Sequence, residues 1–279
     1  MGKFQELQEA FPAKAVDVAG ISTRYIEAGE GPPVVLIHGG GAGADCYGNW
    51  YDCIPRLAEG FHVYALDMLG FGRSEHPDPD DFAYTQGARV DHLAGFVEAL
   101  GLKPVSLIGN SMGGMTSIGV TVSRPGLVDK LVLMGSAGLN RGVREEMRPL
   151  QNYDYSREGM EKIIGVLTHK DFVPEDGLVD YRFELATEPA TRKAYSATMG
   201  WVKEQRGLFY EEDFIRRVDV PTLVTGGKDD IVVPLPLAMR FLELIEDSWG
   251  YFVPRCGHWA MLEHPEDFAA ATARFLSSG

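Results

Sequence analysis

Short apolar runs alternate along this chain with longer segments of helical periodicity. We predict seven strands, at residues 22–29, 34–39, 61–67, 105–109, 130–135, 222–227 and 249–254. The second to the sixth of these runs are almost purely apolar, as strands are when helices cover both faces of a sheet. Four helical patterns accompany them, at 84–100, 112–123, 235–246 and 265–276. The alternation predicts an α/β fold with one mainly parallel sheet flanked by helices.

The alternation is interrupted between about residues 140 and 210. This stretch is charged and helical in pattern, with no convincing strand. Pro221 and the apolar run after it then resume the sheet. We therefore predict a helical cap at 140–210, inserted into one core domain made of 1–139 and 211–279. A length of 279 residues suits one large domain with such an insertion.

The composition narrows the class of protein. Its 45% of hydrophobic residues is typical of a globular protein with a sizeable core. No apolar run approaches the ~18 residues of a membrane span, and the polar start MGKFQELQEAF lacks a secretory signal. Three scattered cysteines fit a reducing compartment, so we expect a cytoplasmic protein. The net charge of −14 argues against nucleic acid and anionic membranes as partners, and an anionic substrate would need a positive group in its pocket.

One glycine-rich segment lies where an apolar strand passes into a helix. It reads Gly109-Asn110-Ser111-Met112-Gly113 and fits the pattern G-x-S-x-G. The flanking glycines permit a turn tight enough to expose the serine hydroxyl above the sheet. The helix that begins there favours developing negative charge. We predict that Ser111 is a nucleophile, the alternative being an ordinary glycine–serine turn.

A serine hydroxyl needs an adjacent base, and the base needs a group to orient it. His258 follows the last predicted strand and Asp230 follows the strand before it, so both lie at strand carboxyl ends, where open α/β sheets place their sites. Asp229 competes for the acid role. We prefer Asp230 because families with this order place G-x-x-D before an apolar pair and proline. Cys256, two residues before the histidine, is more simply a buried thiol.

The loop after the first buried strand, His38-Gly39-Gly40-Gly41-Ala42-Gly43, predicts donors for an oxyanion. Gly40 or Gly41 would supply one amide and Met112 the other, as in the HGGG pattern of esterases. The same loop also matches the dinucleotide-binding pattern G-x-G-x-x-A, and Asp67 ends the next strand at the position of the ribose-binding acid. Residues 45–49 open no obvious helix, which counts against a nucleotide. His258 and His264 lack the H-E-x-x-H spacing of a zinc site, so we expect neither metal nor cofactor.

Several segments together resemble the meta-cleavage product hydrolases, enzymes that hydrolyse a carbon–carbon bond in the dienoates formed by ring-opening of catechols. They are HGGGAGADCYGNW, DMLGFGRS, GNSMGG, GKDDIVVP and CGHWAMLEHPEDF, and the likeness runs over nearly the whole chain. TRKAYSATMGWVKEQRGLFY, in the predicted cap, looks nearest to the carbazole-pathway members, whose substrate carries an aminophenyl ketone. Ala42 departs from the pattern, since many members have proline there. The resemblance implies the α/β-hydrolase fold with an inserted helical cap.

The resemblance also implies a reaction. A 2-hydroxy-6-oxo-hexa-2,4-dienoate passes from enol to keto form, and Ser111, activated by His258, attacks the C6 ketone. Cleavage releases 2-hydroxypenta-2,4-dienoate, and water then hydrolyses the acyl-enzyme to a carboxylic acid. The positions that match those holding the dienoate end are Asn49, Asn110, Arg182 and Trp259. A homodimer is a further expectation from the family.

Arg182 separates this function from the alternatives. From the sequence alone, an arginine in the helical run DYRFEL would be a solvated surface charge. The resemblance places it in the pocket instead, where it would supply the cation that an acidic protein needs for an anionic substrate. Two other functions remain open: a carboxylesterase or lactonase with the same triad, and a binding protein of this fold without turnover. A dehalogenase is disfavoured because its nucleophile would be aspartate.

Overall fold

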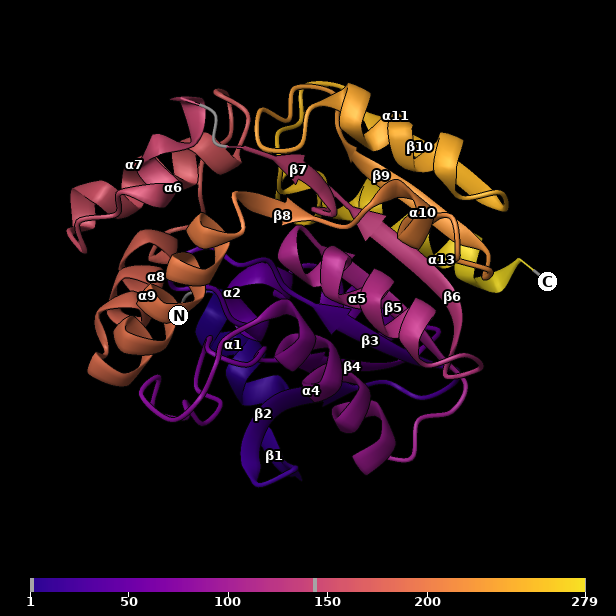
Figure 1. Ribbon diagram of the computed structural model, residues 1–279, viewed down its shortest axis with the longest axis horizontal. Coiled ribbons are helices and arrows are strands. Elements are labelled where there is room, and N and C mark those ends of the chain that lie inside the picture. Colours follow the sequence, from indigo (N-terminus) through magenta and orange to yellow (C-terminus); the bar gives the residue numbers. More distant parts are fainter. Residues whose placement is uncertain (1–2, 143–144, 279) are drawn as a thin grey trace.

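The computed structural model describes residues 3–142 and 145–278. Its main sheet has eight strands in the spatial order β1-β2-β4-β3-β5-β6-β9-β10 (Figure 1). Strand β2 runs antiparallel to both of its neighbours, and all other neighbouring strands are parallel. The strands are β1 (Lys14–Val18), β2 (Ile21–Ala28), β3 (Pro33–Ile37), β4 (His62–Leu66), β5 (Val105–Asn110), β6 (Val128–Met134), β9 (Thr222–Gly227) and β10 (Ser248–Val253). The predicted mainly parallel sheet is thus confirmed.

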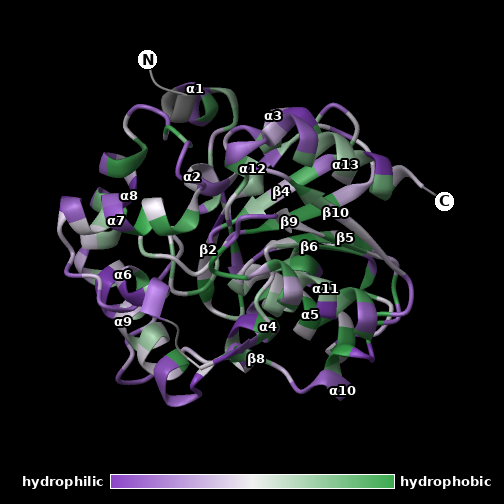
Figure 2. Cartoon of the chain, turned by 90° about the horizontal axis from the view of Figure 1, so that it is seen from above, coloured by the Kyte–Doolittle hydropathy of each residue, from purple (hydrophilic) through white to green (hydrophobic). Residues whose placement is uncertain are grey.

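Helices cover both faces of this sheet. Seen from above, α3 and α13 lie on one side of it and α4, α5 and α11 on the other (Figure 2). The core helices are α1 (Lys3–Ala10), α2 (Cys46–Trp50), α3 (Cys53–Leu57), α4 (Gln86–Ala99), α5 (Met112–Ser123), α10 (Glu212–Ile215), α11 (Leu235–Leu244), α12 (Ala260–Glu263) and α13 (Pro265–Ser277). This covering explains why strand β5 is buried at every residue. Within the described part of the chain, none of the helices combines the length and apolar character that crossing a membrane requires.

The segment predicted as a cap is mostly helical and lies beyond one end of the sheet (Figure 1). It contains η1 (Glu145–Met147), α6 (Arg148–Gln151), α7 (Arg157–Leu167), α8 (Leu178–Thr187) and α9 (Pro189–Glu204). Ser156 caps the N-terminus of α7 by accepting a hydrogen bond from the amide of Gly159. One face of α7 is apolar and buried, so packing stabilises the helix more than its sequence propensity does.

The expectation of no strand between 140 and 210 is wrong. Strands β7 (Leu139–Arg141) and β8 (Gly207–Phe209) pair antiparallel in a separate ribbon that joins the two ends of the helical segment. Three residues are too few to show an alternating pattern, which is why the sequence did not reveal them. The division into a core of 1–139 with 211–279 and a cap of 140–210 remains a prediction.

Candidate active site

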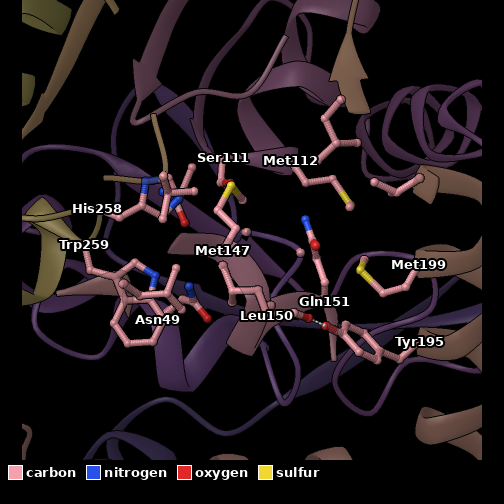
Figure 3. A pocket seen from close by; sticks show the side chains of 18 of the residues that line it. Asn49, Ser111, Met112, Met147, Leu150, Gln151, Tyr195, Met199, His258 and Trp259 are labelled. Atoms are coloured by element: carbon pink, nitrogen blue, oxygen red, sulfur yellow. Dashed lines mark hydrogen bonds between the residues drawn. The ribbon is translucent and has the colours of Figure 1, made fainter. Parts of the chain in front are cut away.

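Ser111 lies at the sharp turn between β5 and α5. Its φ of 52° is in the left-handed region, a strained conformation for a residue with a side chain. The turn closes because its neighbours are glycine: a Cβ at Gly113 would lie 2.4 Å from the carbonyl oxygen of Ile37. The amide of Ser111 donates to the carbonyl of Met134 at 3.2 Å, which ties the turn to β6. The arrangement directs the hydroxyl into a cavity above the sheet (Figure 3).

His258 and Asp230 form a buried hydrogen-bonded pair beside this serine. The ring Nδ1 of His258 lies 2.8 Å from Oδ2 of Asp230, which leaves Nε2 available to act as a base. The other carboxylate oxygen, Oδ1, accepts from the amides of Val232 and Val233 at 2.7 and 2.9 Å. Asp229 is exposed. The structure therefore brings the preferred aspartate, and not its neighbour, to the histidine.

The predicted oxyanion loop lies against Met112. Gly40 and Gly41 line the same cavity as Ser111, and a Cβ at Gly40 would lie 2.5 Å from Cε of Met112. In residues 3–142 and 145–278, the amides of Gly40, Gly41 and Met112 donate to no other protein group. Free amides at the edge of a cavity can receive an oxyanion, and the assignment of these three as its donors remains a prediction.

The cavity has a volume of about 120 Å³ and lies between the sheet and the helical segment. The core contributes the glycine loop, the serine turn, His258, Trp259 and Val232. The helical segment contributes mainly apolar side chains, namely Met147, Leu150, Leu167, Tyr195, Met199 and Val202, together with the polar Gln151 and Arg182. The serine and histidine thus face a largely apolar cavity, in which electrostatic interactions are stronger than in water.

Arg182 is fully buried in this cavity wall. Its Nη1 donates to Oδ1 of Asn49 at 3.1 Å and its Nη2 to the carbonyl of Ala42 at 2.9 Å, while the guanidinium lies 4.8 Å from the ring centre of Trp259. Its Nε has no partner, and in the described part of the chain no carboxylate pairs with it. Burial lowers the pKa of Arg182 to about 10, with Asp45 opposing the shift, so the group stays charged at neutral pH.

Three of the predicted substrate-binding residues, Asn49, Arg182 and Trp259, therefore lie together. The fourth, Asn110, also lines the cavity. Its Nδ2 donates to the carbonyl of Met134 at 3.1 Å, and its buried Oδ1 has no partner. Ala42 is the position at which the sequence departs from the pattern of the family. It is fully buried, and its carbonyl accepts the hydrogen bond from Arg182, which holds the glycine loop in place of a proline.

The expectation that residues 45–49 open no helix is wrong. Helix α2 begins at Cys46 and is capped by Asp45, whose Oδ1 accepts from the amide of Gly48 at 2.6 Å. With only five residues, all buried, it carries no apolar periodicity that a sequence could show. The side chain of Asp45 nevertheless occupies an amide at the N-terminus of α2, where the pyrophosphate of a dinucleotide would bind.

Asp67, the apparent ribose-binding acid, has a structural role instead. Its carboxylate accepts from the amides of Cys46 and Arg73 at 2.7 and 2.8 Å and lies 3.6 Å from Arg24. One oxygen of Asp67, one of Asp45 and the Cys46 sulfur lie within 4.8 Å of one another. Because burial raises the pKa of the Cys46 thiol and the carboxylates already accept backbone amides, this cluster is explained as the support of the glycine loop.

Two comparisons decide the family. The model of the alpha/beta hydrolase family matches residues 34–271. The chain is also 54% identical over 274 residues to the 2-hydroxy-6-oxo-6-(2'-aminophenyl)hexa-2,4-dienoic acid hydrolase of Metapseudomonas resinovorans, covering 98% of this chain and 93% of that one. This chain is a meta-cleavage product hydrolase of the alpha/beta hydrolase family.

Other meta-cleavage product hydrolases agree. The chain is 34% identical to the 2-hydroxy-6-oxo-2,4-heptadienoate hydrolase of Pseudomonas putida, covering 95% of this chain and 96% of that one. A solved serine hydrolase involved in carbazole degradation shares 53% identity with a TM-score of 0.89, covering 96% and 99% of the two chains. The resemblance found in the sequence is confirmed.

Sequence reasoning missed one residue that holds the histidine loop of this hydrolase. The carboxylate of Glu263 accepts from the amides of Gly257 and Trp259, on either side of the histidine, at 3.0 and 3.2 Å. It also accepts from the amide of His169 at 2.7 Å, just after α7. Carboxylate bonds to backbone amides leave no sequence pattern, so the sequence analysis assigned Glu263 no role.

His92 gives a prediction about the stability of this hydrolase. The ring lies in α4 and its Nε2 bonds Thr23 in β2 at 2.8 Å. Burial lowers the pKa of His92 from 6.5 to about 4. As the pH falls, the unfolded chain binds a proton at His92 before the folded chain does. The contribution of neutral His92 to the free energy of unfolding is therefore complete above pH 6.5 and is lost as the pH falls toward 4.

The variant His92→Gln should remove this loss while keeping a polar partner for Thr23. Urea unfolding at pH 7 and pH 5 should show that the variant loses about 2 kcal/mol less than the unmodified chain between these values. An equal loss in both proteins would mean that His92 is not the group that titrates. Asp45, whose pKa burial raises to about 6, acts in the opposite direction and is present in both proteins.

Proposed function

We propose that this chain hydrolyses the carbon–carbon bond of 2-hydroxy-6-oxo-hexa-2,4-dienoates, releasing 2-hydroxypenta-2,4-dienoate and a carboxylic acid. The observation that carries the proposal is the buried guanidinium of Arg182, which shares a cavity with Ser111 and His258 and pairs with no carboxylate of the described chain. A buried charge is costly unless it is paired. The carboxylate of a dienoate would supply the missing partner.

The carboxylate end of the substrate would bind at the group formed by Arg182, Asn49 and Trp259. The planar guanidinium can bind a carboxylate in two places, and its Nε is still free to donate. With that end held, the C6 ketone comes to Ser111. The 2-hydroxyl proton moves to C5, which converts the enol to the keto form and leaves C5 saturated next to the ketone.

Bond cleavage then follows from the triad. His258 takes the hydroxyl proton of Ser111 while Oγ attacks C6, and Asp230 stabilises the imidazolium that forms. The tetrahedral oxyanion is received by the amides of Met112 and of Gly40 or Gly41. When it collapses, the C5–C6 bond breaks and its electron pair enters the conjugated 2-oxo system. The dienolate takes the proton from the histidine and leaves as 2-hydroxypenta-2,4-dienoate.

The acyl-enzyme is hydrolysed by the same groups. The histidine removes a proton from water, the hydroxide attacks the acyl carbon, and the serine oxygen recovers the proton as the acid departs. We also propose that 140–210 acts as a cap, since its side chains form much of the cavity wall. The cytoplasmic location and the homodimer remain predictions.

The test is to supply the purified protein with coloured dienoates that carry a phenyl or a methyl end. The absorbance should fall, with hydroxypentadienoate and benzoate or acetate formed in equal amounts. We expect a higher kcat/KM for the phenyl substrate, because the apolar wall of the cavity can bury the ring. Hydrolysis of aryl acetates with no consumption of either dienoate would replace this proposal with the esterase.

A further inference from the structure

We propose that Gln151 selects substrates whose C6 substituent is an aromatic ring with an N–H donor beside the ketone, such as a 2-aminophenyl group. The inference rests on the proposed function and concerns the end of the substrate that the proposal leaves open. It follows from the position of this side chain in the cavity and from the chemistry of its neighbours.

The cavity has a polar half and an apolar half. Asn49 and Trp259 lie to one side of Ser111, and Met112 and Met199 lie to the other (Figure 3). If the carboxylate binds in the polar half and C6 lies at the serine, the substituent on C6 must enter the apolar half. An aromatic ring suits this half, because methionine side chains adapt to its shape and make favourable sulfur–aromatic contacts.

Gln151 brings an amide into this apolar half. It ends helix α6, and its side chain points between Met112 and Met199 (Figure 3). Met147, Leu150 and Met199 lie around it in the cavity wall and are apolar (Figure 3). Tyr195 lies there too, and its hydroxyl donates to the carbonyl of Leu150 at 3.4 Å. In residues 3–142 and 145–278 nothing bonds the amide of Gln151, so it is free to bind a ligand.

The chemistry of an ortho-amino ketone matches one acceptor at this position. One N–H of the amino group can bond the adjacent ketone oxygen within the substrate, and the second N–H needs another acceptor. An N–H buried without a partner is costly. The amide oxygen of Gln151 can accept it, whereas a plain phenyl ring has nothing to donate. The 2-aminophenyl group of the relative's named substrate has this arrangement.

The experiment compares Gln151→Leu with the unmodified protein on three dienoates with 2-aminophenyl, phenyl and 2-methylphenyl ends. The readout is the ratio of kcat/KM for the aminophenyl substrate to that for the phenyl substrate. Because Gln151 is exposed at the edge of the cavity and also meets water, we expect the ratio to fall about twofold to tenfold in the variant. The methylphenyl substrate, which has similar bulk but no N–H, should follow the phenyl substrate in both proteins.

Met147→Leu is the matched control, since it changes an apolar side chain in the same wall. It should alter kcat/KM for the aminophenyl and phenyl substrates by the same factor. An unchanged ratio in Gln151→Leu, or an equal fall of the ratio in both variants, would overturn the inference while leaving the proposed function intact. If the unmodified protein consumes no dienoate, the proposed function fails first and this inference fails with it.

Discussion

Replacing Ser111 or His258 with alanine is expected to lower kcat on a dienoate by several orders of magnitude, because the members of a triad act as a unit. The two aspartates give the sharper test. Asp230→Asn should lower kcat about 10⁴-fold, since an amide cannot accept the Nδ1–H of the histidine and favours the wrong tautomer. Asp229→Asn should change kcat by less than about threefold, as expected for an exposed residue.

The geometry explains this difference between neighbours. Asp230 is held by the amides of Val232 and Val233 and faces His258 at 2.8 Å. Gly135 packs against the pair, so closely that a Cβ at this position would lie 3.0 Å from Nδ1 of the histidine. Stopped-flow absorbance with each purified variant measures the effect, and circular dichroism controls for folding. A large loss in Asp229→Asn together with a small one in Asp230→Asn would reverse the assignment.

The parts of the fold that the sequence predicted are those in which one force acts over many residues. Strands buried on both faces must be apolar along their length, and β3 and β5 are recognisable for that reason. The serine turn was recognisable because close backbone contacts at Gly109 and Gly113 admit only glycine. The proposed triad residues could be brought together from the sequence because residues that follow parallel strands meet at one edge of the sheet.

The missed elements are short and depend on single contacts. Strand β1 is mostly exposed and lies at the edge of the sheet beside β2, so its residues show no apolar pattern. Helix α2 depends on the cap formed by Asp45, and strands β7 and β8 depend on each other. Each is fixed by a partner elsewhere in the fold, which the local sequence does not encode.

The position of Arg182 shows the same limit within the site. In helix α8 the arginine itself interrupts the apolar pattern, because it stands among Leu178, Leu185 and Ala186, which are buried with it. Burial of Arg182 is decided by Asn49 and Ala42, which lie more than a hundred positions earlier. Only the resemblance to a family could place the residue in the pocket.

Arg182→Met is expected to lower kcat/KM on a dienoate at least ~30-fold while barely changing the hydrolysis of a neutral aryl acetate. Losing one partner of a buried, hydrogen-bonded charge pair costs ~2–5 kcal/mol, or roughly 30- to 5,000-fold. Methionine fills much of the same volume without the charge. An aryl acetate has no carboxylate to pair with the guanidinium, so it should not lose this energy.

Arg89→Met provides a matched control. Arg89 is also a buried arginine, 1% exposed, and its Nη1 and Nε donate to Tyr84 and Gln86 at 3.1 and 3.2 Å. It lies against Trp201 of helix α9, outside the residues that line the cavity. Its replacement tests whether loss of any buried arginine near the cap damages the enzyme in general. Both substrates should respond to it by the same factor.

The deciding measurement is the kcat/KM for a phenyl dienoate divided by that for phenyl acetate, in the unmodified protein and in Arg182→Met and Arg89→Met. If Arg182 binds the substrate carboxylate, this quotient falls at least ~30-fold in Arg182→Met and stays constant in Arg89→Met. A constant quotient in Arg182→Met, whether both activities persist or both fall together, would contradict a dienoate carboxylate at Arg182 and favour the esterase.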